Sequence, residues 1–157
     1  MENYDVIVAV SFGMRKNEPG LSNISLAEET IKAIRSQQRP AIVQSEIYDL
    51  IQGKLSPIYA VFEAKNPGLE YFDTRGVLIE AKKICTERNW NRMWIIAHPD
   101  HRYRTVKIAK RLGFTGSAPL LHIPYDKLST QWWTRSKFLF FIREIPVLLY
   151  YKIKKWI

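Results

Sequence analysis

Two histidines and an arginine follow one of the most apolar runs of the chain. His98, His101 and Arg104 come directly after residues 93–97, whose sequence is Met-Trp-Ile-Ile-Ala. An imidazole titrates near neutral pH and can transfer a proton, and a guanidinium matches the geometry of a phosphate or carboxylate. Ligands of open α/β sheets bind beyond the carboxyl ends of the strands. We therefore expect this turn to bind an anion through Arg104, with His101 or His98 as acid or base.

The elements that must position these groups follow from the apolar pattern. Strands are predicted near residues 6–10, 41–44, 58–62, 93–97 and 119–123. Helical spacing between them predicts a helix opened by the Ser25 and Glu28 capping box, one capped by Asp73 or Thr74, and one over about 102–112. Strands alternating with helices indicate one α/β domain over residues 1–157, with a mainly parallel sheet and helices on both faces.

Three further groups of polar residues stand at predicted element ends. Ser11, Phe12 and Gly13 follow the first strand, Ser45 and Glu46 follow the second, and Thr74 begins a helix. The carboxyl ends of parallel strands share one edge of a sheet, so we expect these residues to surround one ligand-binding cleft with His98, His101 and Arg104. The alternatives are structural: a turn at Ser11 and Gly13, a helix cap at Thr74, a solvated Glu46 and a packed His98.

Metal and nucleophile chemistry have little support in the sequence. Three ligands crowded at His98, Asp100 and His101 rarely face one ion, and the only other histidine is His122. We therefore expect no bound metal. The chain also has no nucleophile elbow of the Gly-x-Ser-x-Gly type and no Walker phosphate loop.

The charge of the chain is concentrated in its second half. The total is +9, but residues 1–80 carry 8 Lys and Arg against 11 Asp and Glu, and residues 81–157 carry 16 against 4. This asymmetry indicates either an anionic partner or a solvated basic face. Nucleic acid is the less favoured partner, because no recognised nucleic-acid-binding module is present. The N-terminus lacks a basic leader, and the single Cys85 fits a reducing compartment, so a cytoplasmic location is expected.

The last part of the chain is apolar, aromatic and basic. Residues 136–156 predict a helix, bent or interrupted near Pro146, that is too short and too charged to span a bilayer. In the favoured interpretation, one face packs on the sheet through Ile142, Ile145, Leu149 and Ile153. In the alternative, the helix lies on the face of an anionic membrane.

Several of these residues together resemble the YdcF-like/SanA-like family, a bacterial domain without an established reaction. The resemblance rests on the strand and glycine loop from Val6 to Gly13, on Thr74, and on the His101-x-x-Arg104 step followed by Gly113. It extends to the Arg143-Glu144 pair before an apolar, then basic, helix. It implies a Rossmann-like fold, a nucleotide-like ligand such as S-adenosylmethionine, and a link to cell-envelope metabolism.

Two functions are therefore predicted from the sequence. The first is a protein, or an enzyme, that binds an anionic or nucleotide-like small molecule through Arg104 and the Thr74 helix terminus, with His101 or His98 as acid or base. The alternative is a non-catalytic binding or scaffold protein held at the inner face of the membrane by its basic C-terminal helix. The sequence predicts no oligomeric state.

Overall fold

The computed structural model describes residues 4–54, 58–61 and 73–157, and residues 58–61 by their backbone only. The strands are β1 Val6–Ala9, β2 Ala41–Gln44, β3 Ile58–Val61, β4 Arg92–Ile96 and β5 Thr115–Ser117. The helices are α1 Leu21–Gln37, α2 Ser45–Ile51, α3 Thr74–Glu87, α4 Pro99–Arg111 and α5 Lys137–Ile153, with a 3₁₀ turn at Trp132–Thr134. The predicted order of strands and helices is confirmed.

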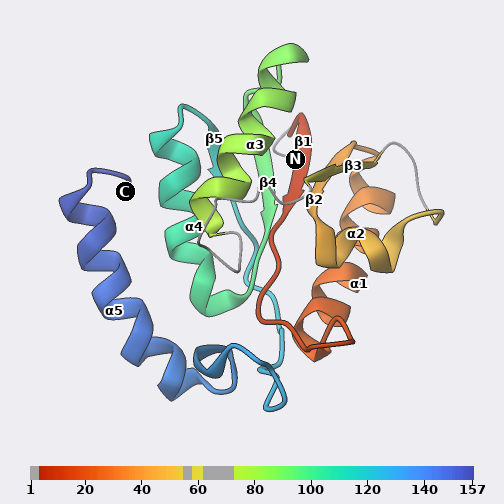
Figure 1. Ribbon diagram of the computed structural model, residues 1–157. Helices are drawn as coiled ribbons and strands as arrows, with labels where there is room; N and C mark the ends of the chain where they lie inside the picture. The colour runs from red at the N-terminus through yellow and green to blue at the C-terminus, as the bar shows by residue number, and fades with distance from the viewer. Residues whose placement is uncertain (1–3, 55–57, 62–72) are drawn as a thin grey trace.

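All strand pairs are parallel, in the order β3-β2-β1-β4-β5. This is a Rossmann-like sheet, because the chain moves outward from β1 to β3 and then crosses back to place β4 on the other side of β1 (Figure 1). The order of the strands reverses between β1 and β4. The loops after these two strands therefore separate at the carboxyl edge, where such sheets bind ligands.

The two faces of the sheet are covered by different helices, which makes the three layers predicted from the sequence. The alternation along β1 shows the division, since Val6 and Val8 pack with α3 and α4, whereas Ile7 and Ala9 pack with α1 and α2. All four of these side chains are fully buried. A central parallel strand needs apolar residues on both faces, which is why β1 is a continuous apolar run.

The predicted fifth strand at 119–123 is wrong. The strand that pairs with β4 is the short segment Thr115–Ser117, whereas residues 118–126 form no strand. Pro119 and Pro124 bracket the apolar run and have no N–H to donate to a sheet. The run is apolar for another reason, since Ile123 is buried against the α1 side of the sheet.

Two helices begin earlier than the sequence pattern indicates. Helix α1 starts at Leu21 rather than at the Ser25 and Glu28 capping box, because the carboxylate of Asp126 accepts a hydrogen bond from the Leu21 N–H at 3.0 Å. Helix α4 starts at Pro99, with His98 as its N-cap. Both starts depend on acceptors that the local apolar pattern does not reveal.

Helix α5 differs from the favoured prediction in the face that it buries. It continues through Pro146 without interruption and lies beside α4 at the border of the molecule, rather than over the sheet (Figure 1). The residues predicted to pack on the sheet are exposed: Ile142, Ile145, Leu149 and Ile153. Helices α1 to α4 already cover both faces of the sheet. Among the described residues, no helix is both long and apolar enough to cross a membrane.

Candidate functional site

A cleft opens at the carboxyl edge of the sheet, near the point where the strand order reverses. It is bordered by the loop after β1, the start of α2, the first turns of α3 and α4, and the segment that leads into α5. The predicted site residues that line it are Ser11, Phe12, Gly13, Glu46, Thr74, His101 and Arg104. These residues, far apart in sequence, therefore share one cavity, and their roles in ligand binding stay predictions.

Two predicted residues do not line this cleft. Ser45 donates a hydrogen bond from its hydroxyl to Glu46 Oε2 at 3.2 Å. The ring of His98 stacks on Phe12 with a centroid distance of 3.8 Å, and its Nδ1 accepts a hydrogen bond from the Asp100 N–H. Burial lowers the pKa of His98 to about 4, against the opposing charge of Asp100. His98 is thus a neutral helix cap in the core, which is the structural alternative stated above.

His101 is held in one orientation by two neighbours. Arg104 Nη2 lies 2.9 Å from His101 Nε2, and Thr74 Oγ1 lies 2.7 Å from the same nitrogen. A guanidinium can only donate, so Nε2 is the acceptor and the ring proton resides on Nδ1. Burial, reinforced by the positive charge of Arg104, lowers the pKa of His101 well below its usual range. The ring is therefore neutral at pH 7, and its proton-accepting nitrogen is already occupied.

Arg104 is itself tied to a carboxylate from α5. Its Nε donates to Glu144 Oε1 at 2.8 Å, and both side chains are almost fully buried. Burial raises the pKa of Glu144, and the charge of Arg104 opposes that rise. Arg104 was predicted to capture an anion directly. In the structure its charge is balanced by Glu144, so its first effect is to position His101.

The start of α3 is acidic. Asp73 caps this helix, accepting a hydrogen bond from the Gly76 N–H through Oδ1 and another from the Tyr151 hydroxyl through Oδ2. A carboxylate already satisfies the helix N-terminus, so the predicted anion capture at the Thr74 terminus has a competitor within the protein. The Thr74 hydroxyl is instead used by His101.

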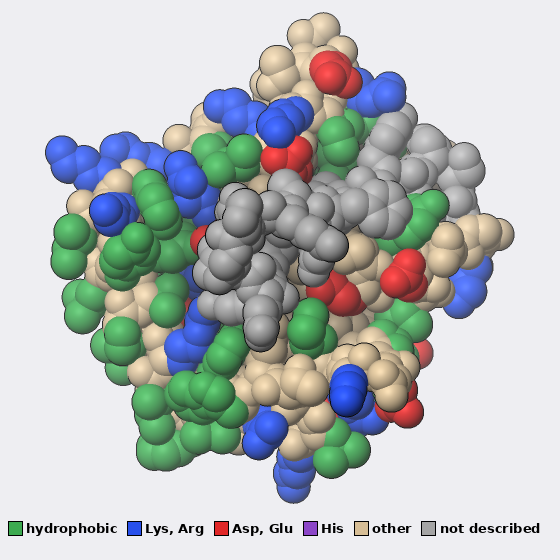
Figure 2. Space-filling model, in the orientation of Figure 1, with side chains coloured by type: hydrophobic (Ala, Val, Ile, Leu, Met, Phe, Trp, Pro, Cys, Tyr) green, Lys and Arg blue, Asp and Glu red, His purple; other side chains and the backbone are tan. Residues whose placement is uncertain are grey.

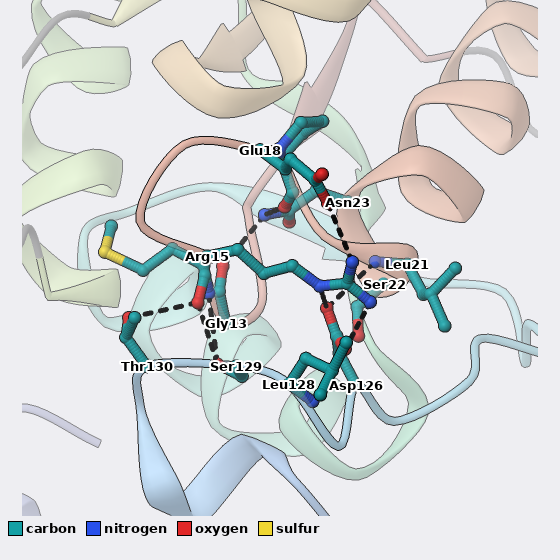
Figure 3. A network of polar contacts seen from close by, with 12 residues as sticks. Gly13, Arg15, Glu18, Leu21, Ser22, Asn23, Asp126, Leu128, Ser129 and Thr130 are labelled. Atoms are coloured by element: carbon teal, nitrogen blue, oxygen red, sulfur yellow. Dashed lines mark hydrogen bonds and ion pairs between the residues drawn. The ribbon is translucent and has the colours of Figure 1, made fainter.

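The loop after β1 is fixed by buried polar side chains. Asn23 accepts a hydrogen bond from the Phe12 N–H at 2.9 Å and donates to the carbonyls of Gly13 and Pro19. The Arg15 guanidinium donates two hydrogen bonds to the carboxylate of Asp126, in a bidentate pair that joins this loop to the segment before α5 (Figure 3). The cleft wall formed by residues 11–14 is therefore held by hydrogen bonds to α1 and to the segment before α5.

Substitution of Gly13 by Ala is expected to destabilise the fold. Gly13 has φ +72°, and an added Cβ would lie 2.7 Å from Thr134 Oγ1 and 3.1 Å from Ser129 Oγ. Gly53 is the matched control, because its φ is +75° but no atom of the described residues lies within 4 Å of an added Cβ. We expect Gly53→Ala to cost about 1 kcal/mol from backbone strain, and Gly13→Ala roughly 1–3 kcal/mol more from overpacking. Urea denaturation measures both, and equal losses would contradict the close packing of this loop.

The sequence prediction missed the half of the cleft that follows β5. Gln131, Trp133 and Arg143 line the cleft, and the Arg143 guanidinium lies 4.5 Å from the centre of the Trp133 ring. These residues stand in no strand-end position, so the strand-end rule does not find them. The sequence did contain one indication of this half of the cleft, the Arg143-Glu144 pair of the family resemblance. Arg143 lines the cleft, and Glu144 accepts a hydrogen bond from Arg104.

Within the described part of the chain, no group of three or more His, Cys, Asp or Glu side chains is placed to hold a metal ion. Comparison of the sequence and structure with protein-family models, with curated proteins and with solved structures finds no match.

Proposed function

We propose that the protein binds a small anionic, nucleotide-like molecule in the cleft at the carboxyl edge of its sheet. The observation that carries this proposal is the state of His101. This side chain is 6% exposed, its Nε2 is held by Arg104 and Thr74, and its Nδ1 has no hydrogen-bond partner among the described residues. A buried N–H donor without a partner is costly, and an acceptor oxygen of a ligand would satisfy it.

The charges around the cleft favour a ligand with two chemically different ends. Arg143 and Arg104 lie on the α4 and α5 side, whereas Glu46 and Asp73 lie on the α2 and α3 side. A phosphate or carboxylate suits Arg143, because the charge of Arg104 is already balanced by Glu144. Hydroxyl or amino groups of the ligand suit the carboxylates. A nucleotide-like molecule such as S-adenosylmethionine or a nucleoside phosphate carries such groups. The ring of Trp133 adds an aromatic surface on which a base can stack.

The geometry favours binding over proton transfer by His101. A general base needs a free nitrogen, but the Nε2 lone pair faces Arg104 and Thr74. In the proposed complex, His101 therefore donates a hydrogen bond through Nδ1 and orients the ligand. Any chemical step would depend on groups that the ligand itself brings.

Membership of the YdcF-like/SanA-like family, with its link to the cell envelope, is part of this proposal. Its support is that several residues of the resemblance meet at one site. Thr74 and Arg104 contact His101, and Glu144 pairs with Arg104. Gly113 is not part of this site, since it follows the far end of α4, where its φ is +96°. Short motifs that coincide by chance would have no reason to converge in space.

Substitution of Arg143 tests whether the cleft binds an anionic ligand. We expect S-adenosylmethionine, ADP or inorganic phosphate to raise the melting temperature of the wild-type protein, because a ligand that binds only the folded state stabilises it. Arg143→Gln should weaken binding about tenfold or more, the usual effect of losing a charge-assisted hydrogen bond. Isothermal titration calorimetry measures the affinity.

Arg88→Gln is the matched control, since Arg88 also lies near a tryptophan, Trp90, but at the far end of α3. This variant should bind as the wild type does. The proposal is contradicted if none of the three probes binds, or if both variants lose affinity equally.

A further inference from the structure

The outward face of α5 is an exposed apolar stripe. Its residues recur at helical spacing along the whole element: Phe138, Phe141, Ile142, Ile145, Leu149 and Ile153. Phe138 is 74% exposed and Ile153 is 78% exposed. A helix of 17 residues is about 25 Å long, so the stripe extends over one border of the molecule. Contiguous apolar surfaces of this kind mark interaction sites.

The stripe is not needed to hold the helix in place. Phe140, Glu144 and Tyr151 point inward and are buried, and they connect α5 to the core and to the cleft. The Pro146 ring is also on the exposed side. The fold is thus complete while the outward face of α5 lies open to solvent.

Positive charge accompanies the stripe at both ends. Lys137 stands in the first turn, where its Nζ lies 3.9 Å from Asp100 Oδ1. Lys152 stands in the last turn, and Lys154 and Lys155, which complete a lysine cluster, follow the helix directly. The only carboxylate of α5, Glu144, is buried against Arg104, so the outward face carries no negative charge. Figure 2 shows apolar side chains gathered along this border of the molecule, with basic side chains beside them. Surfaces that combine large apolar side chains with lysines bind the interface of anionic membranes.

A second copy of the chain is a poorer occupant. Two α5 faces packed antiparallel would bring Lys137 of each copy near the lysine cluster of the other. Asp100, whose Oδ1 lies 3.9 Å from Lys137 Nζ, offsets one charge at each end, but the outward face of α5 itself supplies no carboxylate to the cluster. Like charges at that distance repel. Lipid phosphates instead complement the lysines while the acyl region accepts the apolar stripe.

We propose that α5 is a membrane-surface helix that lies in the plane of an anionic bilayer. Its apolar stripe enters the interface, its lysines contact lipid phosphates, and its inward face stays docked on the protein. The cleft then lies about one helix diameter, roughly 10 Å, from the membrane surface, because Phe140 and Arg143 of α5 line it.

Vesicle co-sedimentation of the full chain tests this proposal. We expect binding to vesicles of phosphatidylcholine with phosphatidylglycerol, and little binding to phosphatidylcholine alone. The double variant Ile145→Gln and Leu149→Gln should reduce the partition coefficient about tenfold or more, because two large side chains no longer enter the interface. The double variant Lys154→Gln and Lys155→Gln should lose most of the preference for anionic vesicles.

The matched control is Leu120→Gln with Leu128→Gln, which changes two exposed leucines outside α5. It should bind vesicles as the wild type does, and all three variants should keep the wild-type melting temperature. Absence of binding to anionic vesicles overturns the proposal, as does an equal loss in the control. So does a dimer in light scattering that Ile145→Gln with Leu149→Gln converts to a monomer while vesicle binding is unchanged.

Discussion

Glu144→Gln is expected to lower the free energy of unfolding by roughly 3–5 kcal/mol. The substitution keeps the size of the side chain but leaves the buried guanidinium of Arg104 without its counter-charge, and both side chains are at most 5% exposed. In a domain of this length the loss corresponds to a fall in melting temperature of roughly 6–20 °C. Calorimetry or guanidinium denaturation measures it.

Glu80→Gln is the control, because Glu80 and Lys83 form an ion pair on the solvated face of a helix. Such pairs contribute about 0.3–0.5 kcal/mol, so this variant should unfold almost as the wild type does. The double variant Arg104→Met with Glu144→Leu removes both charges and should be less destabilised than Glu144→Gln alone. A loss below about 1 kcal/mol in Glu144→Gln would show that Arg104 does not depend on Glu144.

Acid is expected to destabilise the protein between pH 6.5 and 4 because His98 is buried in its neutral form. Its pKa is lowered to about 4 in the folded state, from 6.5 in the unfolded state. Within that interval the unfolded chain binds the proton more readily, so stability falls as pH falls and is fully present above pH 6.5. The shift corresponds to roughly 3 kcal/mol. The pKa of His101 is lowered as well, which adds to the effect in the same direction.

The variant His98→Asn tests the assignment, because asparagine can accept the Asp100 N–H as a helix cap but does not titrate. Urea denaturation from pH 7 to pH 4 should give a shallower loss of stability for this variant. His122→Asn is the control, since His122 is exposed, and its pH dependence should match that of the wild type. The lowered pKa of Asp126, caused by Arg15, acts at lower pH and does not mimic the effect. Identical curves for wild type and His98→Asn would refute the prediction.

The strand-end rule predicted one half of the cleft from the sequence. Buried parallel strands must be apolar on both faces, so β1, β2 and β4 are visible as continuous apolar runs. The polar residues after each run then fall at the same edge, which is why Ser11, Glu46 and His101 could be grouped correctly. The same rule also placed Ser45 and His98 in the cleft, and neither residue lines it. The local pattern also gave Asp73 or Thr74 as the cap of α3, and the structure shows that the cap is Asp73.

The other half depends on contacts that no local pattern contains. Glu144 reaches Arg104 across 40 residues, and Asp126 caps α1 from 105 residues away. The strand β5, Thr115–Ser117, is three residues long and polar at both ends, so it gives no alternating or continuous apolar signal. His98 and His101 are alike in sequence, and only their packing separates a stacked helix cap from a residue of the cleft.

The sequence also did not predict which face of the C-terminal helix α5 is buried. Apolar residues at helical spacing indicate that a helix has an apolar face, but not which surface that face meets. Both faces of α5 are rich in apolar residues, and the face that is buried is the one with a carboxylate, Glu144, in its middle. The partner of that carboxylate decides the orientation of the helix.

The position of α5 also has a thermodynamic consequence. Glu144 and Tyr151 connect the inward face of this helix to Arg104 and Asp73 at the cleft, while its outward face is the membrane surface proposed above. Two binding events that share one helix are linked. Any free energy by which an occupied cleft shifts α5 must reappear, with equal size and sign, in the affinity for the bilayer. Lipid association and ligand affinity can then be read as two measurements of a single coupling constant.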